Sequence, residues 1–377
     1  MRKTVAIIGT RGYPSYYGGF ETAVRRLAPY LAERGWDVTV YGRRGTTVLD
    51  DPSADARVGT RVTPGLETKS LSTLSYGLTA SLDAARRKPD VALVLNCANG
   101  FWLPLLKRRG IPTVVNVDGI EWDRAKWGGL AKKVFREGAV WTARHADRVI
   151  YDAKAIEDRW LAEFGRGGDV IAYGGEVPPA HPVEAGLTHR GYALMVARFV
   201  PENTVTDFFE AAREIARTRD VVIVGSSGYG GPIEEAVVEL TRSNARVRWF
   251  GHVSDDARLH ALWQHAGAYF HGHSVGGTNP ALVQAMACGA PVVARDTVFN
   301  REVLGDAGVF VEPDPRQIAA AVLSLLDDPD RQDLLAQRAQ ARAVEAYSWD
   351  AVHAAYERSL LAAVASRRPA FAETSGA

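Results

Sequence analysis

One glycine-rich loop and one arginine are the residues of this chain best placed to do chemistry. The loop His271 to Pro280 joins an apolar run to a small-residue stretch, with Pro280 at the predicted first turn of a helix. Free backbone N–H groups at such a loop, together with the positive end of the helix, attract phosphate oxygens. Arg198 follows another apolar run at the same predicted sheet edge, where its guanidinium could bridge two phosphoryl groups. A surface ion pair is the alternative for Arg198.

A second glycine-rich loop runs from Gly9 to Gly19, between a buried run and a helical pattern that starts at Phe20 and stops at Gly35. It is longer than the roughly 2–6 residues usual for such a connection, which favours a functional role. As a phosphate motif it is weak, because it lacks the G-x-G-x-x-G spacing. The next predicted strand ends in Arg43 and Arg44 instead of the acidic residue that an NAD ribose requires, so dinucleotide binding is disfavoured.

The residue types of a metal site are present without the spacing. His271 and His273 alternate with glycine, but no further ligand stands at a suitable distance along the chain. The acidic run 327–330 imitates a D-x-D motif, yet it falls between two helical patterns, where a helix cap is expected. Cys97 and Cys288 are the only cysteines, which excludes a disulfide framework. We expect no metal and no cofactor.

The composition is that of a globular protein with two domains. The 377 residues are 46% hydrophobic and 24% charged, with a net charge of +1. Short β-branched runs alternate with helical patterns, which predicts α/β architecture with parallel sheets covered by helices. The predicted strands are residues 4–8, 38–41, 91–95, 113–117, 148–151, 170–172, 192–197, 221–224, 247–250, 268–270, 291–294 and 309–311.

A Pro/Gly cluster at residues 174–182 breaks this rhythm and predicts a domain boundary. We expect an N-terminal Rossmann-like domain over residues 1–180 and a C-terminal one over residues 181–347. A helix over residues 348–366 would cross back to the first domain, and residues 367–377 would form a tail. Two doubly wound domains facing a cleft would hold ligands at the carboxyl ends of their strands.

Charge and hydropathy restrict the setting and the partners. Met1 leads almost directly into a strand without the apolar stretch of a signal peptide, and no run approaches the ~18 apolar residues of a spanning helix. We therefore expect a cytoplasmic protein. The first half is the more basic, and segments 101–109 and 132–141 offer peripheral contact with the inner membrane face as an alternative to ordinary core helices. The basic excess is too small for a nucleic-acid partner.

Five motifs occur in order along the chain: Tyr17 to Thr22, Asp118 to Trp122, Ala197 to Asn203, His271 to Pro280 and Phe299 to Val303. Together they resemble glycosyltransferase family 4, with its rhamnosyltransferase-like subgroup the closest branch, and the resemblance runs through Asp350. It implies a GT-B fold and a metal-independent transferase that retains anomeric configuration. A nucleoside-diphosphate sugar would bind mainly to the second domain. A saccharide, lipid-linked or small-molecule acceptor would bind mainly to the first.

The resemblance also implies roles for single residues. Arg198 would neutralise the leaving diphosphate, with Asp118 and Gly19 as the other catalytic residues. The implied donor site consists of Gly18, Gly19, Arg198, Phe250, Gly251, His252, Val253, Gly276, Gly277, Thr278, Asn279 and Gln284. The implied acceptor-binding residues are Tyr17, Glu121 and Trp122. Hydrogen-bond donors held ready at the diphosphate stabilise the transition state more than the ground state, because charge gathers there during transfer.

Four positions depart from the broad family pattern. Asn203 stands where most members have Lys, and a pair of glutamates eight apart becomes Gly276 and Gln284. Asp118 stands where many relatives have His, and a 6-deoxy sugar has no 6-hydroxyl for such a His to meet. We therefore expect dTDP-L-rhamnose or another dTDP-deoxysugar as the donor. The missing Glu and Lys leave two alternatives, a catalytically silent sugar-nucleotide-binding protein and another GT-B enzyme such as a sugar-nucleotide epimerase.

Overall fold

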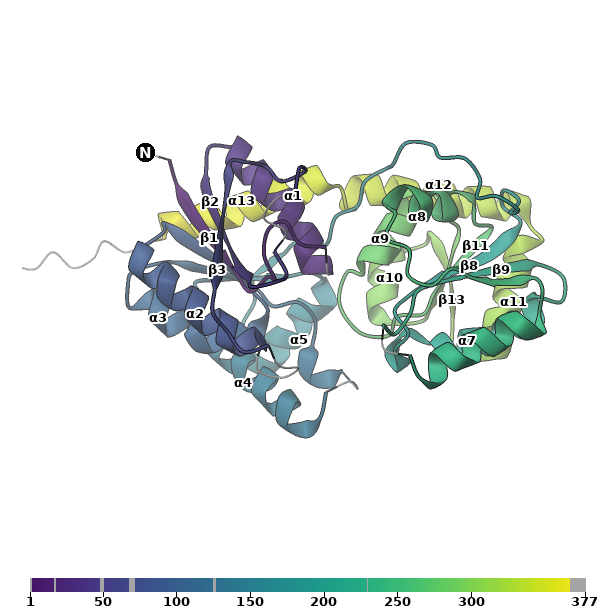
Figure 1. Ribbon diagram of the computed structural model, residues 1–377, viewed down its shortest axis with the longest axis horizontal. Coiled ribbons are helices and arrows are strands. Elements are labelled where there is room, and N and C mark those ends of the chain that lie inside the picture. The colour runs from purple at the N-terminus through teal and green to yellow at the C-terminus, as the bar shows by residue number, and fades with distance from the viewer. Residues whose placement is uncertain are drawn as a thin grey trace, which may run out of the picture. The chain divides into compact units, whose positions relative to one another are not determined.

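The computed structural model, which describes residues 2–16, 18–47, 51–67, 72–124, 127–228 and 230–366, consists of two compact units (Figure 1). The first comprises Met1–Ala172 and Asp350–Ala377, and the second comprises Tyr173–Trp349. The sequence analysis places the boundary a few residues later, after residue 180. Residues of the Pro/Gly segment bond within the second unit, as where Gly175 N donates to Tyr347 O at 2.7 Å.

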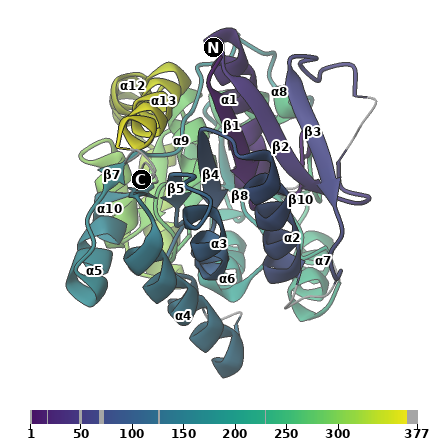
Figure 2. The ribbon, with the colours of Figure 1, turned by 90° about the vertical axis from the view of Figure 1, so that its left-hand side faces the viewer.

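The first unit is built on a parallel sheet of seven strands in the order β3-β2-β1-β4-β5-β6-β7, which the labelled strands of Figure 2 follow from one edge to the other. Central strands such as β4 are buried along their whole length because helices cover both faces. The strands are β1 (Thr4–Ile8), β2 (Asp37–Arg43), β3 (Val58–Thr63), β4 (Val91–Leu95), β5 (Thr113–Asn116), β6 (Arg148–Tyr151) and β7 (Asp169–Val170).

The helices of the first unit cover the two faces of this sheet. Helices α1 and α13 lie together on one side, where the rings of Tyr30 and His353 are 5.1 Å apart, and α2, α3 and α4 lie on the other (Figure 1). The helices are α1 (Gly19–Glu33), α2 (Ser72–Arg87), α3 (Leu103–Lys107), α4 (Gly129–His145), α5 (Lys154–Phe164) and α13 (Trp349–Ala365), with 3₁₀ turns at η1 (Cys97–Trp102) and η2 (Glu121–Asp123).

Strand β3 is the strand that the hydrophobic pattern missed. It lies at the edge of the sheet, and most of its residues are partly or fully exposed, so it lacks the continuous apolar run of a central strand. It pairs in parallel with β2, in a register that sets Thr63 opposite Arg43. All the strands that were predicted occur within a few residues of their expected bounds.

The second unit contains a parallel sheet of six strands in the order β10-β9-β8-β11-β12-β13. Its core includes Phe208 and Phe270, whose rings stack with centroids 5.0 Å apart. Its strands are β8 (Tyr192–Val196), β9 (Asp220–Val224), β10 (Val247–Trp249), β11 (Ala268–His271), β12 (Val292–Arg295) and β13 (Gly308–Val311). The prediction of two doubly wound α/β units is therefore confirmed.

Helices connect these strands and pack against the second sheet. They are α6 (Val205–Ile215), α7 (Pro232–Ser243), α8 (Asp256–His265), α9 (Pro280–Ala287), α10 (Val298–Leu304), α11 (Pro315–Leu326) and α12 (Pro329–Ala346), with a 3₁₀ turn at η3 (Pro201–Asn203).

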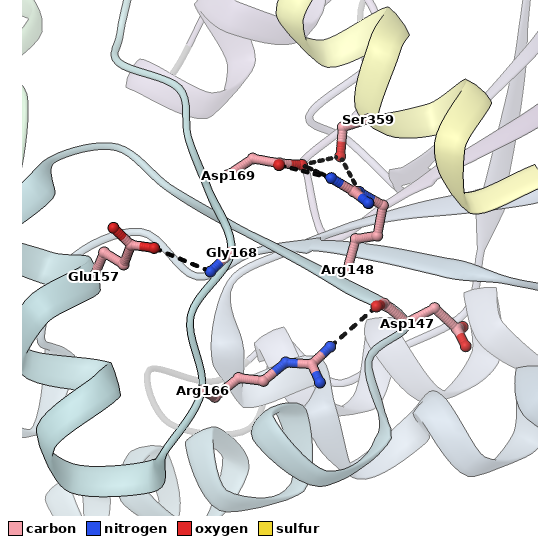
Figure 3. A network of polar contacts seen from close by, with 7 residues as sticks. All are labelled: Asp147, Arg148, Glu157, Arg166, Gly168, Asp169 and Ser359. Carbon is pink, nitrogen blue, oxygen red and sulfur yellow. Dashed lines mark hydrogen bonds and ion pairs between the residues drawn. The ribbon is translucent and has the colours of Figure 1, made fainter. Parts of the chain in front are cut away.

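Helix α13 is bonded to the first unit although it follows the second in sequence. Ser359 Oγ donates to Asp169 Oδ2 at 2.7 Å, and Arg148 bonds to both of them (Figure 3). Two residues earlier on the helix, Glu357 accepts from Trp36 Nε1 at 3.1 Å. These bonds fix the helix against the strands β6 and β7 and the start of β2. This is the helix that the sequence analysis expects over residues 348–366.

Two further observations concern the length and hydropathy of the helices and the state of the thiols. Within the described ranges, no helix is both long enough and apolar enough to cross a membrane. Cys97 and Cys288 are buried free thiols, and burial raises the pKa of both, that of Cys288 to about 12.

Candidate functional site

The carboxyl edge of the second sheet brings together the residues predicted to hold a diphosphate. Arg198 comes two residues after β8, and Gly276 to Asn279 lie between β11 and α9. Strands β8 and β11 are neighbours at the point where the strand order reverses. In open parallel sheets, the crevice at this switch point is where ligands bind.

The loops after β8 and β11 are bonded to each other. Thr204 Oγ1 donates to Gly272 O at 2.6 Å, and Ser274 donates from both its N and its Oγ to Glu202 O, at 2.9 and 2.8 Å. A Cβ at Gly272 would lie 2.4 Å from Asn203 O, so only glycine permits this approach. The two loops therefore form one supported surface instead of two independent segments.

Asn203, which replaces the family's Lys, has a positioning role in this surface. Its side chain is buried, and its Nδ2 donates to Arg198 O at 2.9 Å. On the other side of the glycine loop, Asn300 Nδ2 donates to His273 O and Arg295 O, both at 2.9 Å. Two buried amides thus hold the backbones of the two loops that carry the predicted diphosphate contacts.

The Arg198 side chain is exposed, and its guanidinium has no hydrogen-bond or ion-pair partner among the residues that the structure describes. The ion-pair alternative is therefore not observed there. Burial and the neighbouring His273 lower the pKa of His271 well below its usual value, so this ring is neutral and adds no charge. Arg198 is thus an exposed cation at this edge that can meet an anion.

The N-terminus of α9 adds backbone donors to this charge. Its N-cap, Asn279, accepts from Ala281 N at 3.0 Å, and the first turn contains no acidic residue. Gly276 has φ +107°, and nothing lies within 4 Å of where its Cβ would be, so the loop leaves space for a ligand. The arrangement can bind a diphosphate through a guanidinium and backbone amides.

The segment Phe250 to Val253 follows the edge strand β10. Phe250 N donates to Ile223 O at 3.0 Å, and Gly251 O accepts from Gly225 N at 2.7 Å. The guanidinium of Arg258 lies 4.6 Å from the centre of the Phe250 ring. Phe250 is thus held in place, while His252 is exposed.

The glycine-rich loop 225–231, between β9 and α7, was missed in the sequence analysis. The start of this loop packs against the strand end that carries Arg198: a Cβ at Gly225 would lie 1.8 Å from Ala197 O, and Phe199 N donates to Ser226 O at 3.1 Å. The signal that could have identified this loop is its run of glycines followed by a proline at the start of a helix. The carboxylate of Glu234, in the first turn of α7, accepts from Ser227 N at 2.8 Å, so this helix start already holds an anion.

Gln284 lies one turn into α9, where the sequence analysis predicts a ribose contact. Its Nε2 donates to Glu176 O at 2.8 Å, and its Oε1 accepts from Glu176 N at 3.4 Å. Both ends of the amide are therefore engaged with the backbone of one residue of the Pro/Gly segment.

In the first unit, Gly18 and Gly19 form the start of α1, and Tyr17 lies outside the described residues. The buried carboxylate of Glu21 accepts from Arg11 N at 3.1 Å and from Thr10 Oγ1 at 3.4 Å. The loop before α1 therefore closes on an acidic side chain of the helix itself.

Asp118 follows β5 in a left-handed conformation, with φ +62°, which Asp tolerates better than most residues. Its N donates to Asn116 Oδ1 at 2.9 Å, and Asn116 Nδ2 is 2.5 Å from the hydroxyl of Tyr356 on α13. Helix α13 thus supports the backbone that presents Asp118.

Glu121 and Trp122 have structural contacts at the positions where acceptor binding is predicted. The buried Glu121 carboxylate is 2.6 Å from Arg124 Nε and accepts from Trp127 Nε1 at 2.9 Å. The ring of Trp122 packs against Trp160, with centroids 6.0 Å apart. An acceptor role for either residue would have to act alongside these contacts.

Among the described side chains, no group of three or more histidines, cysteines, aspartates or glutamates is placed to hold a metal ion. Metal independence itself stays a prediction.

Comparisons with known proteins match both units. Residues 18–174 match the family described as "Glycosyl transferase 4-like domain", and residues 181–342 match "Glycosyl transferases group 1". O-antigen chain mannosyltransferase B of Escherichia coli is 29% identical over 171 residues, 44% of each chain, so this match spans less than half of that relative. MMP alpha-(1->4)-mannosyltransferase of Mycolicibacterium hassiacum is 26% identical, with 94% of this chain and 98% of that protein aligned.

Two solved structures share the fold along their whole lengths. Sucrose-phosphate synthase of Thermosynechococcus elongatus has a TM-score of 0.79 at 19% identity, and covers 96% of this chain and 100% of its own. Anabaena HepE in complex with UDP and glucose has a TM-score of 0.76 at 16% identity, with the same coverage. At these identities the similarity shows the fold alone, and it does not identify the sugar that this chain transfers.

Proposed function

Because the chain is a family-4-type glycosyltransferase with the GT-B fold, we propose that it transfers a sugar from a nucleoside diphosphate bound at the second unit, with retention of anomeric configuration and without a metal ion. One observation carries this proposal: the exposed guanidinium of Arg198 stands at the switch point beside the acid-free start of α9. A leaving diphosphate is the part of the donor that such a site fits.

The chemistry follows from where charge develops. The bond between the anomeric carbon and the diphosphate oxygen breaks, leaving an oxocarbenium-like centre and a more negative diphosphate. Arg198 and the amides of residues 276–278 stabilise that negative charge. They thereby take the electrostatic role that a metal ion would otherwise have. The acceptor hydroxyl attacks the face from which the diphosphate leaves, and the departing phosphate oxygen takes its proton. No enzyme nucleophile is needed.

For the donor we propose a dTDP-deoxysugar, with L-rhamnose preferred. Supporting it, the Gln284 amide donates to Glu176 O and accepts from Glu176 N, so it offers the ribose one neutral oxygen that is already engaged, where a glutamate would offer two charged oxygens. Thymidine nucleotides lack the 2′-hydroxyl. The UDP of the HepE complex makes UDP-sugars the donors to compare, and the relatives with mannosyl names make mannose the sugar to compare. The acceptor we propose is a saccharide, free or lipid-linked, or a small molecule.

Calorimetric titration with dTDP and UDP, in the presence of EDTA, tests the site. We expect binding to the full chain, weakened about tenfold in Arg198→Ala by the loss of one charge-assisted contact. Arg242→Ala, which removes an exposed arginine at the far end of α7, is the matched control and should bind like the wild type. Equal affinity in all three proteins would overturn the placement of the diphosphate.

A further inference from the structure

The first unit has a small cavity of its own, open to solvent, at the carboxyl ends of β1, β2 and β3. Helix α2 closes one side of it. The polar residues that line it include Thr10, Arg43, Thr63, Thr73 and Tyr76. None of these residues has a role in the donor site.

Arg43 is the unusual member of this lining. Its side chain is only 7% exposed, and its Nε is buried without a hydrogen-bond partner in the described part of the chain. The guanidinium lies 5.3 Å from the centre of the Tyr76 ring. A buried guanidinium nitrogen that lacks a partner is costly, and burial lowers the pKa of Arg43.

Thr63 repeats this pattern next to Arg43. The two residues are opposite each other in the register of β2 and β3, and both line the cavity. Thr63 is also 7% exposed, and its Oγ1 is buried without a hydrogen-bond partner among the described residues. The hydroxyl of Thr63 and the Nε of Arg43, both buried without a partner among the described residues, thus belong to neighbouring residues that line one space. This is the donor set that an oxyanion satisfies.

The acidic groups near Arg43 do not fill this role. Glu21 and Glu67 act on Arg43 only at a distance, and neither forms an ion pair with it in the structure as described. The carboxylate of Glu21 accepts from Thr10 and Arg11, while Glu67 bonds to the Tyr76 hydroxyl. Arg11 adds a second positive charge to the surroundings of the cavity.

We propose that this cavity binds an oxyanionic group, a phosphate or a carboxylate, on the acceptor. Arg43 donates to the oxyanion from its guanidinium, and Thr63 donates from its hydroxyl. The anion site stands on the geometry alone. Its assignment to the acceptor rests on the proposed function, in which the first unit holds the acceptor.

Thermal unfolding of the full chain with anions tests the proposal. All proteins carry Arg198→Ala, so that the second unit contributes little to anion binding. Sodium phosphate or sodium acetate at about 20 mM is compared with sodium chloride at equal ionic strength. We expect at least one of them to raise Tm by about 2–4 °C, as millimolar binding does. A shift with phosphate alone identifies a phosphate site, and a shift with acetate alone a carboxylate site.

Variants place the effect at the cavity. Arg43→Gln should lose the shift, and Thr63→Val should lose part of it, whereas Arg44→Gln, which alters the exposed neighbour, should keep it. If Arg43→Gln does not fold, Arg43→Lys and Thr63→Val carry the test. The proposal is overturned if neither anion raises Tm above chloride, or if the variants at Arg43 and Thr63 respond like Arg44→Gln. Nucleotide binding, measured separately in wild-type protein, reports on the proposed function alone.

Discussion

The two units contain the same construction, a central strand, a glycine-rich loop and a helix, and differ in what occupies the helix start. In the first unit, Glu21 in the first turn of α1 folds back onto Arg11 N and Thr10. In the second, the first turn of α9 has no acid, and exposed Arg198 stands at the adjacent strand end. A helix N-terminus attracts an anion in either case. The first unit supplies the anion itself, as the carboxylate of Glu21, whereas the start of α9 in the second unit is left open to the anion of a ligand.

Removing Arg198, the cation beside the glycine loop of the second unit, should have the largest effect on this comparison. We expect Arg198→Ala to lower sugar transfer about 10²–10³-fold, because a donor to the developing charge on the diphosphate is lost. The measurement is kcat/KM at saturating acceptor, with a thermal melt to verify folding. Arg242→Ala should retain full turnover. Near-normal turnover in a folded Arg198→Ala protein would remove the basis for placing the leaving group here.

The next largest effect concerns the second turn of the two helices, where α9 has Gln284 and α1 has Ala23. In Gln284→Glu, the carboxylate cannot donate to Glu176 O, so it should turn away and accept from a ribose 2′-hydroxyl. We expect the preference for a dTDP-sugar over its UDP counterpart to narrow by about 1.5–3 kcal/mol. Matched kcat/KM ratios in both proteins measure it. An unchanged ratio would mean that this side chain does not sense the ribose.

A smaller effect should follow from giving the second loop what the first already has. Ala281→Glu puts an acid into the first turn of α9, as Glu21 does in α1. Its charge should weaken nucleoside-diphosphate binding by about tenfold relative to the isosteric Ala281→Gln, through repulsion at the helix start. Calorimetry on the pair of variants separates charge from bulk. Equal affinities would show that the absence of acid at α9 is incidental.

The last prediction is that removing metal ions leaves the rate of sugar transfer unchanged. Transfer should survive exhaustive EDTA treatment, because Arg198 and the loop amides supply the positive field that a metal would provide. Initial rates before and after chelation, with and without added Mg²⁺ or Mn²⁺, measure this. Loss of activity that either ion restores would show that the second loop needs a cation from outside the chain.

How far the sequence predicts this molecule depends on how local the cause is. Buried parallel strands such as β4 can be recognised in the sequence as apolar runs, whereas the edge strand β3 lacks such a run. The anion loop before α9 was found because glycine, proline and the following helix are contiguous. The partners of Glu121 within the fold were not predicted, because Arg124 and Trp127 come within bonding distance of Glu121 only once η2 has formed. The burial of Arg43 likewise depends on β3 and α2, which the position of an arginine after a strand does not show.

Helix α13 also fixes the order in which the molecule can be completed during synthesis. Tyr356 meets Asn116 across 240 residues of chain, and Glu357 meets Trp36 across 321. Domains emerge from the ribosome N-terminal first, so the first unit must wait, without this helix, while the whole second unit is translated. Until then the indole of Trp36 and the amide of Asn116 lack these partners. A nascent chain paused before residue 350 therefore presents a first unit that lacks this helix.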